Sequence, residues 1–126
     1  MILGLGSDIV DIERIALAVR RHPDRFARRI LTPSEWQAYL VRNQCVNFLA
    51  KRFAAKEAVA KALGTGLRGA IQWQTIEVLN NPMGQPQVSL LRDAHTHLPQ
   101  GTGISITLSD ERRYALAFAV HYILAS

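Results

Sequence analysis

Arg52-Phe53-Ala54-Ala55-Lys56-Glu57-Ala58-Val59-Ala60-Lys61-Ala62-Leu63-Gly64 is the stretch of this sequence that decides the fold. Apolar side chains recur at helical spacing from about residue 44 through this stretch. Gly64-Thr65-Gly66 follows, and glycine readily takes the left-handed conformation of a helix C-cap. The sequence therefore predicts one long helix over 44–63.

Two charged residues of this helix, Glu57 and Lys61, are four apart and so lie on one face. Such a pair is usually a solvated ion pair, but positions 46, 49, 50, 53 and 60 fall within about 80° of Glu57. A carboxylate and an ammonium on a core-facing stripe must be paired, bound to metal or placed in a cleft. On this pattern Lys51, Arg52 and Lys56 point elsewhere, and the alanines at 50, 54, 58 and 60 leave room for something bulky.

A second carboxylate, Asp8, lies in a predicted buried strand over residues 2–10. It shares a strand face with Gly4 and Gly6, and glycine in a strand often marks the close approach of a ligand or another backbone. Asp8 either joins Glu57 in a site or, like Asp11, caps the following helix. Both interpretations stay open at this point.

Two carboxylates from separate elements, beside a phosphate-rich substrate, form a typical Mg²⁺ site. Lys61 would then neutralise a phosphoryl group or protonate a leaving oxygen. The turn Gly64-Thr65-Gly66 either offers backbone amides to a phosphate or serves only as a C-cap.

The rest of the chain predicts an α+β fold, with a mainly antiparallel sheet packed against the long helix and shorter helices. Thr32-Pro33-Ser34-Glu35 is a capping box with proline at the first helical position. Residues 113–123 alternate large side chains with small ones, which is typical of a strand. The expected helices are 12–21, 24–29 and 32–41, the expected strands are 71–79, 87–91, 103–108 and 113–123, and 92–98 is ambiguous.

The 126 residues, 48% of them apolar and 20% charged, suit a single domain over 1–126. No apolar run reaches the roughly 20 residues that span a bilayer, and the start lacks the basic region of a signal peptide. The single cysteine, Cys45, has no partner for an internal disulfide and is expected to be a small buried thiol. A cytoplasmic protein is the simplest interpretation.

Twelve of the fifteen basic residues are arginine, and the net charge is +5. Six arginines lie between residues 14 and 29, where Asp24 is the only acid. The cluster is either a solvated face or the docking site of an acidic partner. The alternative function is a basic nucleic-acid-binding module without catalysis, but no DNA-reading or aromatic RNA-binding motif is present.

The sequence resembles the holo-acyl-carrier-protein synthases, the small bacterial class of 4′-phosphopantetheinyl transferases. Two motifs carry the resemblance: Gly6-Ser7-Asp8-Ile9-Val10-Asp11-Ile12 and the F-x-x-K-E-A-x-x-K-A-x-G block that ends at Gly64. It continues through the Gly84-Gln85-Pro86 turn and Ile106–Arg112, and so spans nearly the whole chain. The resemblance implies transfer of 4′-phosphopantetheine from coenzyme A to a serine of acyl carrier protein, in fatty acid biosynthesis.

The resemblance also assigns site residues. It implies that Asp8 and Glu57 bind Mg²⁺, and that Glu57 and Lys61 are catalytic. Arg52 and the turn Gly64, Thr65 and Gly66 match positions near the coenzyme A phosphates, and Pro86 matches a position near the adenine.

Two further implications concern partners. The family is typically a homotrimer with active sites between subunits, and its basic first helix docks acyl carrier protein, which points to Arg14 and Arg21. No nucleic acid or membrane partner is expected. Ser105 stands where many members carry a histidine, which puts that histidine's role in doubt here.

Overall fold

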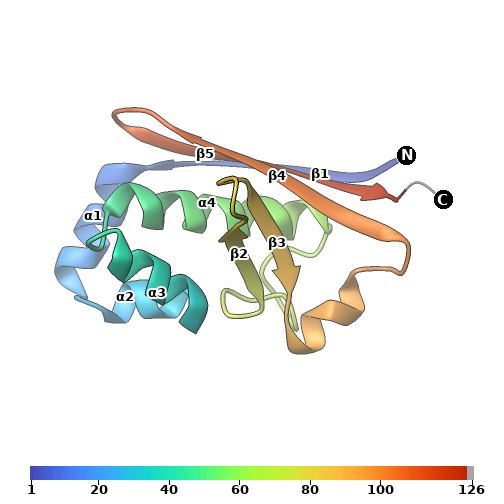
Figure 1. Ribbon diagram of the computed structural model, residues 1–126, viewed down its shortest axis with the longest axis horizontal. Helices are drawn as coiled ribbons and strands as arrows, with labels where there is room; N and C mark the ends of the chain where they lie inside the picture. The colour runs from blue at the N-terminus through green and yellow to red at the C-terminus, as the bar shows by residue number, and fades with distance from the viewer. Residues whose placement is uncertain (125–126) are drawn as a thin grey trace.

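A computed structural model describes residues 1–124 (Figure 1). Within these residues one strand is followed by four consecutive helices and then by four strands interrupted by a short 3₁₀ helix, an α+β order that confirms the predicted fold class. Their bounds are β1 Ile2–Asp11, α1 Ile12–Arg21, α2 Arg25–Ile30, α3 Pro33–Val41, α4 Val46–Ala62, β2 Ile76–Asn80, β3 Pro86–Leu90, the 3₁₀ helix η1 Arg92–His97, β4 Thr102–Asp110 and β5 Tyr114–Ile123.

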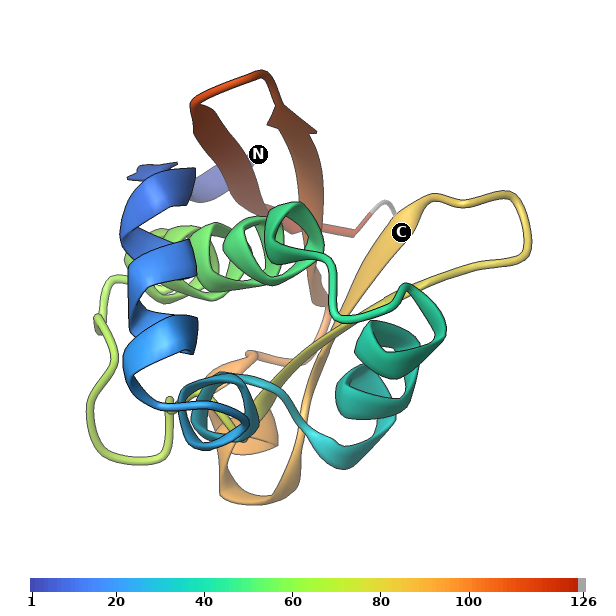
Figure 2. The ribbon, with the colours of Figure 1, turned by 90° about the vertical axis from the view of Figure 1, so that its left-hand side faces the viewer.

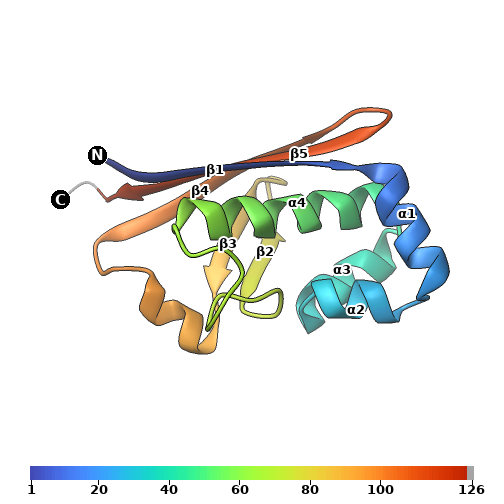
Figure 3. The same cartoon turned by 180° about the vertical axis from the view of Figure 1, so that it is seen from behind.

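All strand pairs are antiparallel. One sheet has the order β1-β5-β4, and a separate two-stranded sheet joins β2 to β3. The long helix α4 lies beneath the three-stranded sheet, while α2, α3 and the β2–β3 hairpin lie on its other side (Figures 1 and 3). Seen from the side, the β2–β3 hairpin projects away from the helices (Figure 2). Helix α4 is therefore the middle layer of the molecule.

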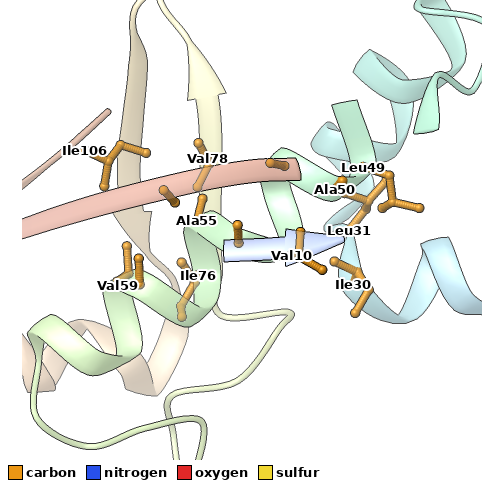
Figure 4. Close-up of a cluster of buried hydrophobic side chains, with 14 of the residues drawn as sticks. Val10, Ile30, Leu31, Leu49, Ala50, Ala55, Val59, Ile76, Val78 and Ile106 are labelled. Atoms are coloured by element: carbon orange, nitrogen blue, oxygen red, sulfur yellow. The ribbon is translucent and has the colours of Figure 1, made fainter. Parts of the chain in front are cut away.

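The three-stranded sheet turns its small side chains toward α4. Ala115, Ala117 and Ala119 of β5 are fully buried, whereas the larger Leu116 and Phe118 between them are exposed. The sheet can therefore approach the helix closely, since alanine adds little thickness between the two layers. The hydrophobic core continues on the other side of α4, where Leu49, Val59, Ile76 and Val78 are among the buried side chains (Figure 4).

Several predicted local features are confirmed. Thr32 accepts a hydrogen bond from the Glu35 amide and Glu35 reaches back to the Thr32 amide, which completes the capping box. Asp11 accepts from the Glu13 amide and so caps α1. The ambiguous stretch 92–98 contains η1. Among residues 1–124, no helix is both long enough and apolar enough to cross a membrane.

Three local predictions are wrong. Strand β1, expected to be buried, exposes Leu5 and Ile9 at 56% and 62% because only one of its faces packs on α4. The expected strand 71–79 begins only at Ile76, because the Thr75 hydroxyl donates to the Ala70 carbonyl at 2.6 Å and accepts from the Gln72 amide at 2.9 Å. These bonds close a turn where the apolar pattern indicated a strand. Cys45 is exposed rather than buried, because α4 starts one residue later and Cys45 occupies its N-cap position.

Candidate active site

Strand β1 packs directly on α4, and this contact places Asp8. A Cβ atom at Gly6 would overlap the Ala58 carbonyl oxygen, and one at Gly4 would overlap the Ala62 carbonyl oxygen. The glycines therefore mark the approach of another backbone, one of the two expected possibilities. Because Asp8 shares their strand face, its carboxylate points to the side of α4 where Lys61 lies.

Lys61 holds the contact between the two elements while staying open to solvent. Its Nζ donates to the Ser7 carbonyl oxygen at 2.8 Å and lies 3.3 Å from Asp8 Oδ1. The Lys61 side chain is 51% exposed and that of Asp8 is 18% exposed. The ammonium group can therefore reach a substrate without leaving its position.

Glu57 is half-buried one helical turn before Lys61. Burial raises the pKa of its carboxyl group, and the negative charge of Asp8 raises that pKa further, while Lys61 lowers it. The two carboxylates are thus close enough to repel each other. A divalent cation would relieve that repulsion, so Asp8 and Glu57 fit a Mg²⁺ ion that takes its other ligands from phosphate and water. Within residues 1–124, no group of three or more His, Cys, Asp or Glu side chains forms a metal cluster.

The predicted orientation of α4 was partly wrong. Lys56 and Arg52, expected to point away from the core, are 0% and 3% exposed, whereas Glu57 is only half-buried and Lys61 is exposed. The reason is that α4 is covered on both sides, so no single apolar stripe marks its buried face. The four alanines leave no room for a ligand, because residues 50, 54, 58 and 60 are fully buried in the packing of α4.

Arg52 lies at a separate place from Glu57 and Lys61. Its Nε donates to the Val78 carbonyl oxygen at 3.1 Å and its Nη2 to Asn80 Oδ1 at 3.2 Å, and burial lowers its pKa to about 10. It lines a cavity of about 200 Å³ together with Arg42, Lys51 and Pro86. This cavity carries three cations, which makes it the second candidate for binding phosphate groups.

These two places are on opposite sides of α4. Arg52 and Lys61 are nine residues apart, so at about 100° and 1.5 Å per residue they project in opposite directions, roughly 13 Å apart along the axis. We call Asp8, Glu57 and Lys61 the first half-site, and the cavity with Arg42, Lys51, Arg52 and Pro86 the second half-site.

The turn after α4 does not offer free amides. The Gly64 amide donates to the Lys61 carbonyl at 3.0 Å, and those of Thr65 and Gly66 donate to the Ala60 carbonyl at 3.3 and 3.1 Å. Gly64 and Gly66 have φ of +80° and +67°, as a C-cap requires. Of the two interpretations of this turn, the structure therefore shows the C-cap, and contact of Gly64, Thr65 and Gly66 with a phosphate stays a prediction.

Comparison with known proteins identifies the family. The model of the 4′-phosphopantetheinyl transferase superfamily matches residues 4–119. The chain belongs to this superfamily. It is 50% identical over 122 residues to the holo-[acyl-carrier-protein] synthase of Edwardsiella ictaluri, with 94% of this chain and 96% of that relative covered.

Solved structures of the family agree in fold. The holo-[acyl-carrier-protein] synthase of Neisseria meningitidis superposes with a TM-score of 0.90 at 42% identity, covering 96% of this chain and 98% of that chain. The Helicobacter pylori synthase in complex with coenzyme A gives a TM-score of 0.82 at 30% identity, covering 93% and 98%. The family fold predicted from the two sequence motifs is therefore confirmed.

The remaining residues suggested by the family resemblance lie on the surface. Arg14 and Arg21 of α1 are seven residues apart, which places both on one helix side, and both are exposed. Among the described residues, neither forms an ion pair, whereas the nearby Arg20 is paired with Glu13 at 3.0 Å. Ser105 is exposed on β4 and lines a cavity of about 380 Å³ that also includes Pro86 and Tyr122.

Sequence reasoning missed a buried ion pair between Lys56 of the family motif and Glu35, which lies outside that motif. Lys56 Nζ lies 2.6 Å from Glu35 Oε1, and both side chains are completely buried. The signal was present in the capping box, since it placed Glu35 at the start of α3, but nothing in the pattern showed that the same carboxylate also reaches α4.

Proposed function

We propose that this chain transfers the 4′-phosphopantetheine group of coenzyme A to a serine of apo acyl carrier protein, giving the holo carrier and adenosine 3′,5′-bisphosphate, in fatty acid biosynthesis. The observation that carries the proposal is the convergence of Asp8, Glu57 and Lys61 from β1 and α4, in a chain whose relatives are named holo-[acyl-carrier-protein] synthases. A relative solved with coenzyme A bound supports the choice of donor.

In the proposed reaction, the serine hydroxyl oxygen attacks the β-phosphorus of coenzyme A, the one that carries pantetheine. A new P–O bond forms as the bond to the adenosine bisphosphate breaks. Glu57 takes the proton of the serine hydroxyl, a role that the raised pKa of its carboxyl group favours. Lys61 donates to the departing phosphate oxygen and stabilises the charge that develops there. A Mg²⁺ ion held by Asp8 and Glu57 would neutralise and orient the pyrophosphate.

The coenzyme A site is proposed to form between two copies of the chain. Arg52 and Pro86 belong to the second half-site, on the opposite side of α4 from Lys61. One copy would therefore supply the first half-site, and a second copy the second half-site, to the same coenzyme A molecule. The turn at residues 64–66 borders the first half-site and would contact the phosphates from outside.

The proposed assembly is a homotrimer built on the sheet face that points away from α4, which we call the outward face. It carries Leu5, Ile9, Leu116 and Phe118, which are 56%, 62%, 43% and 40% exposed. An apolar surface of this kind is typical of a protein interface. Phe118→Asp should convert the trimer to a monomer in light scattering and abolish transfer. A variant that stays trimeric would place the interface elsewhere.

Arg14 and Arg21 are the proposed docking contacts for the acidic carrier. Arg14→Glu with Arg21→Glu should raise the KM for the carrier about ten- to a hundredfold and leave the KM for coenzyme A unchanged. If both constants rise together, these arginines belong to the nucleotide site. If neither changes, the arginines form only a solvated face.

We also propose a domain assignment and a cellular location. Residues 1–126 are proposed to act as one transferase domain, and the protein is proposed to work in the cytoplasm.

Mass spectrometry tests the reaction directly. Apo acyl carrier protein incubated with the chain, coenzyme A and Mg²⁺ should gain the mass of one phosphopantetheine. Asp8→Ala and Glu57→Ala should each lose nearly all of this gain while keeping the fold, because a Mg²⁺ site with one carboxylate missing binds weakly. An unmodified carrier, together with tight binding of nucleic acid by the wild-type chain, would instead favour the nucleic-acid-binding alternative.

A further inference from the structure

Lys56 is next to Glu57 in the sequence, but its side chain makes structural hydrogen bonds in the core. Its Nζ, with no solvent exposure, donates to Glu35 Oε1 at 2.6 Å and to the carbonyl oxygens of Ile30 and Trp73 at 2.7 Å each. These three bonds use all three donors of the ammonium group. One side chain of α4 thus connects the end of α2, the start of α3 and the loop before β2.

Gln74, in the loop before β2, hydrogen-bonds to the same end of α2. Its Nε2 lies 2.8, 3.2 and 2.7 Å from the carbonyl oxygens of Arg28, Arg29 and Leu31. The two amide hydrogens of Gln74 can serve two of these carbonyls at a time, so together with the bond from Lys56 to Ile30 the two side chains supply up to three hydrogen bonds to residues 28–31. A helix leaves four carbonyls without intrahelical partners at its C-terminus, so these two side chains supply most of the capping bonds at this end of α2. We call Lys56 and Gln74 the α2 clamp.

Helix α2 depends on such contacts for its position. It has only six residues, far below the length at which an isolated helix is stable. Its Asp24 N-cap makes no side-chain capping bond, so the beginning of the helix is less firmly held than the end. The clamp therefore sets where the side chains of α2 lie relative to Glu57, which is one residue from Lys56.

Those side chains form a basic surface beside His22, the residue at which α1 ends. Arg25, Phe26 and Arg29 line a cavity of about 180 Å³ with His22. Arg25, Arg28 and Arg29 are exposed, and within residues 1–124 none of them has an acidic partner. An acidic protein that docks on α1 would meet this surface as well.

We infer that Lys56 and Gln74 are positioning residues for the carrier substrate: the α2 clamp fixes the basic surface of α2 at the distance from Glu57 that brings the acceptor serine to the first half-site. This inference rests on the proposed function, because it names how one of its two substrates is placed. Coenzyme A is proposed to contact the two half-sites and not the basic surface of α2, so its binding should not depend on the clamp.

The first test uses Gln74→Ala, which removes half of the clamp without creating a buried charge. The KM for acyl carrier protein should rise about tenfold, whereas that for coenzyme A should stay within about twofold. Hydrogen exchange should become faster at the amides of Arg28 and Leu31, which bond to the Asp24 and Ala27 carbonyls at the two ends of α2, at 2.8 Å each. The matched control is Gln72→Ala on the same loop, whose side chain bonds, among residues 1–124, only to the Gly69 carbonyl, and it should change neither quantity.

The second test separates the clamp from the ion pair. Lys56→Met with Glu35→Gln removes both buried charges, yet still leaves the Ile30 and Trp73 carbonyls without their donor. The carrier KM should rise as in Gln74→Ala, and α2 exchange should speed up while α4 stays protected. If the double variant does not fold, Gln74→Ala alone decides.

Three results would overturn the inference. One is an unchanged carrier KM in Gln74→Ala, another is an equal rise in both Michaelis constants, and the third is unchanged exchange in α2. If the wild-type chain transfers nothing, the proposed function fails, and the exchange rates still show whether the clamp holds α2.

Discussion

Two of the lysine–carboxylate pairs of helix α4 differ in almost every physical respect. Lys56 and Glu35 are 2.6 Å apart with no exposure of either side chain, whereas Lys61 and Asp8 are 3.3 Å apart with side chains 51% and 18% exposed. The two lysines are five residues apart, so they leave the helix about 140° from each other. One points into the core and the other to the surface at the β1 side.

The difference shows how one helix supports both folding and chemistry. Burial lowers the pKa of Lys56, and Glu35 opposes that effect, so the ammonium depends on its partners to stay charged. Its donors are all used within the fold. Lys61 makes weaker contacts and keeps part of its surface in water, which leaves it available to a phosphate. We therefore expect substitutions in the first pair to act on stability and those in the second to act on turnover.

The largest expected effect is on the buried pair. Lys56→Met should lower the free energy of unfolding by about 3–5 kcal/mol, because it leaves the Glu35 carboxylate buried without its cation. Urea denaturation measures this change. The matched control is Lys51→Met on the same helix, whose pair with Asp110 is 3.3 Å long and partly exposed, and it should cost less than about 1 kcal/mol. Equal losses for the two variants would remove the distinction between buried and exposed pairs.

The next effect concerns turnover. Lys61→Ala should lower kcat by about 10²–10³-fold, equivalent to about 2.7–4 kcal/mol of activation free energy, because the ammonium acts on charge at the leaving phosphate. Its free energy of unfolding should change by less than about 1 kcal/mol. Steady-state kinetics with both substrates, together with thermal unfolding, measure the two quantities. A normal kcat with a raised KM for coenzyme A would make Lys61 a binding residue only.

A smaller effect tests how the exposed pair is assembled. Gly6→Ala should cost about 1–3 kcal/mol of stability, since the new methyl group meets the Ala58 carbonyl oxygen and pushes β1 away from α4. The same shift separates Asp8 from Lys61, so transfer should fall as well. Ser7→Ala, whose side chain is exposed, serves as the stability control and should stay within about 0.5 kcal/mol. If Gly6→Ala is as stable as Ser7→Ala, the close approach of β1 to α4 is not essential for stability.

The smallest effect comes from the third lysine pair of α4. The hydrogen bond from Asn47, and then the charge of Lys51, hold the pKa of Asp110 below its ordinary value of 3.8. A lowered carboxyl pKa stabilises the fold above that ordinary value, and the contribution is lost as pH falls through the folded-state pKa. Asp110→Asn should therefore cost less than about 1 kcal/mol near pH 7, and the difference should shrink below pH 3.8. A difference that grows on acidification would contradict this assignment.

Much of the fold was predictable because its signals are local. The capping box at Thr32 and Glu35, the glycine end of α4 and the alternation in 113–123 each depend on residues close together in the chain. The strand 71–79 was predicted too long, since the hydroxyl of Thr75 closes a turn that hydrophobic periodicity does not register. The candidates Asp8, Glu57 and Lys61 were also found from the sequence, and the structure brings them together.

The amino-acid sequence was enough to predict the α+β class, the helix that carries Glu57 and Lys61, and the superfamily, because these follow from periodicity, capping chemistry and a specific motif. Which charges of α4 are buried depends on the packing of the layers around the helix. A helix covered on two sides has no apolar stripe, so the sequence cannot distinguish Lys56 from Lys61. Their partners, Glu35 and Asp8, lie 21 and 53 residues away in the chain, and such distant pairings arise only when the layers pack.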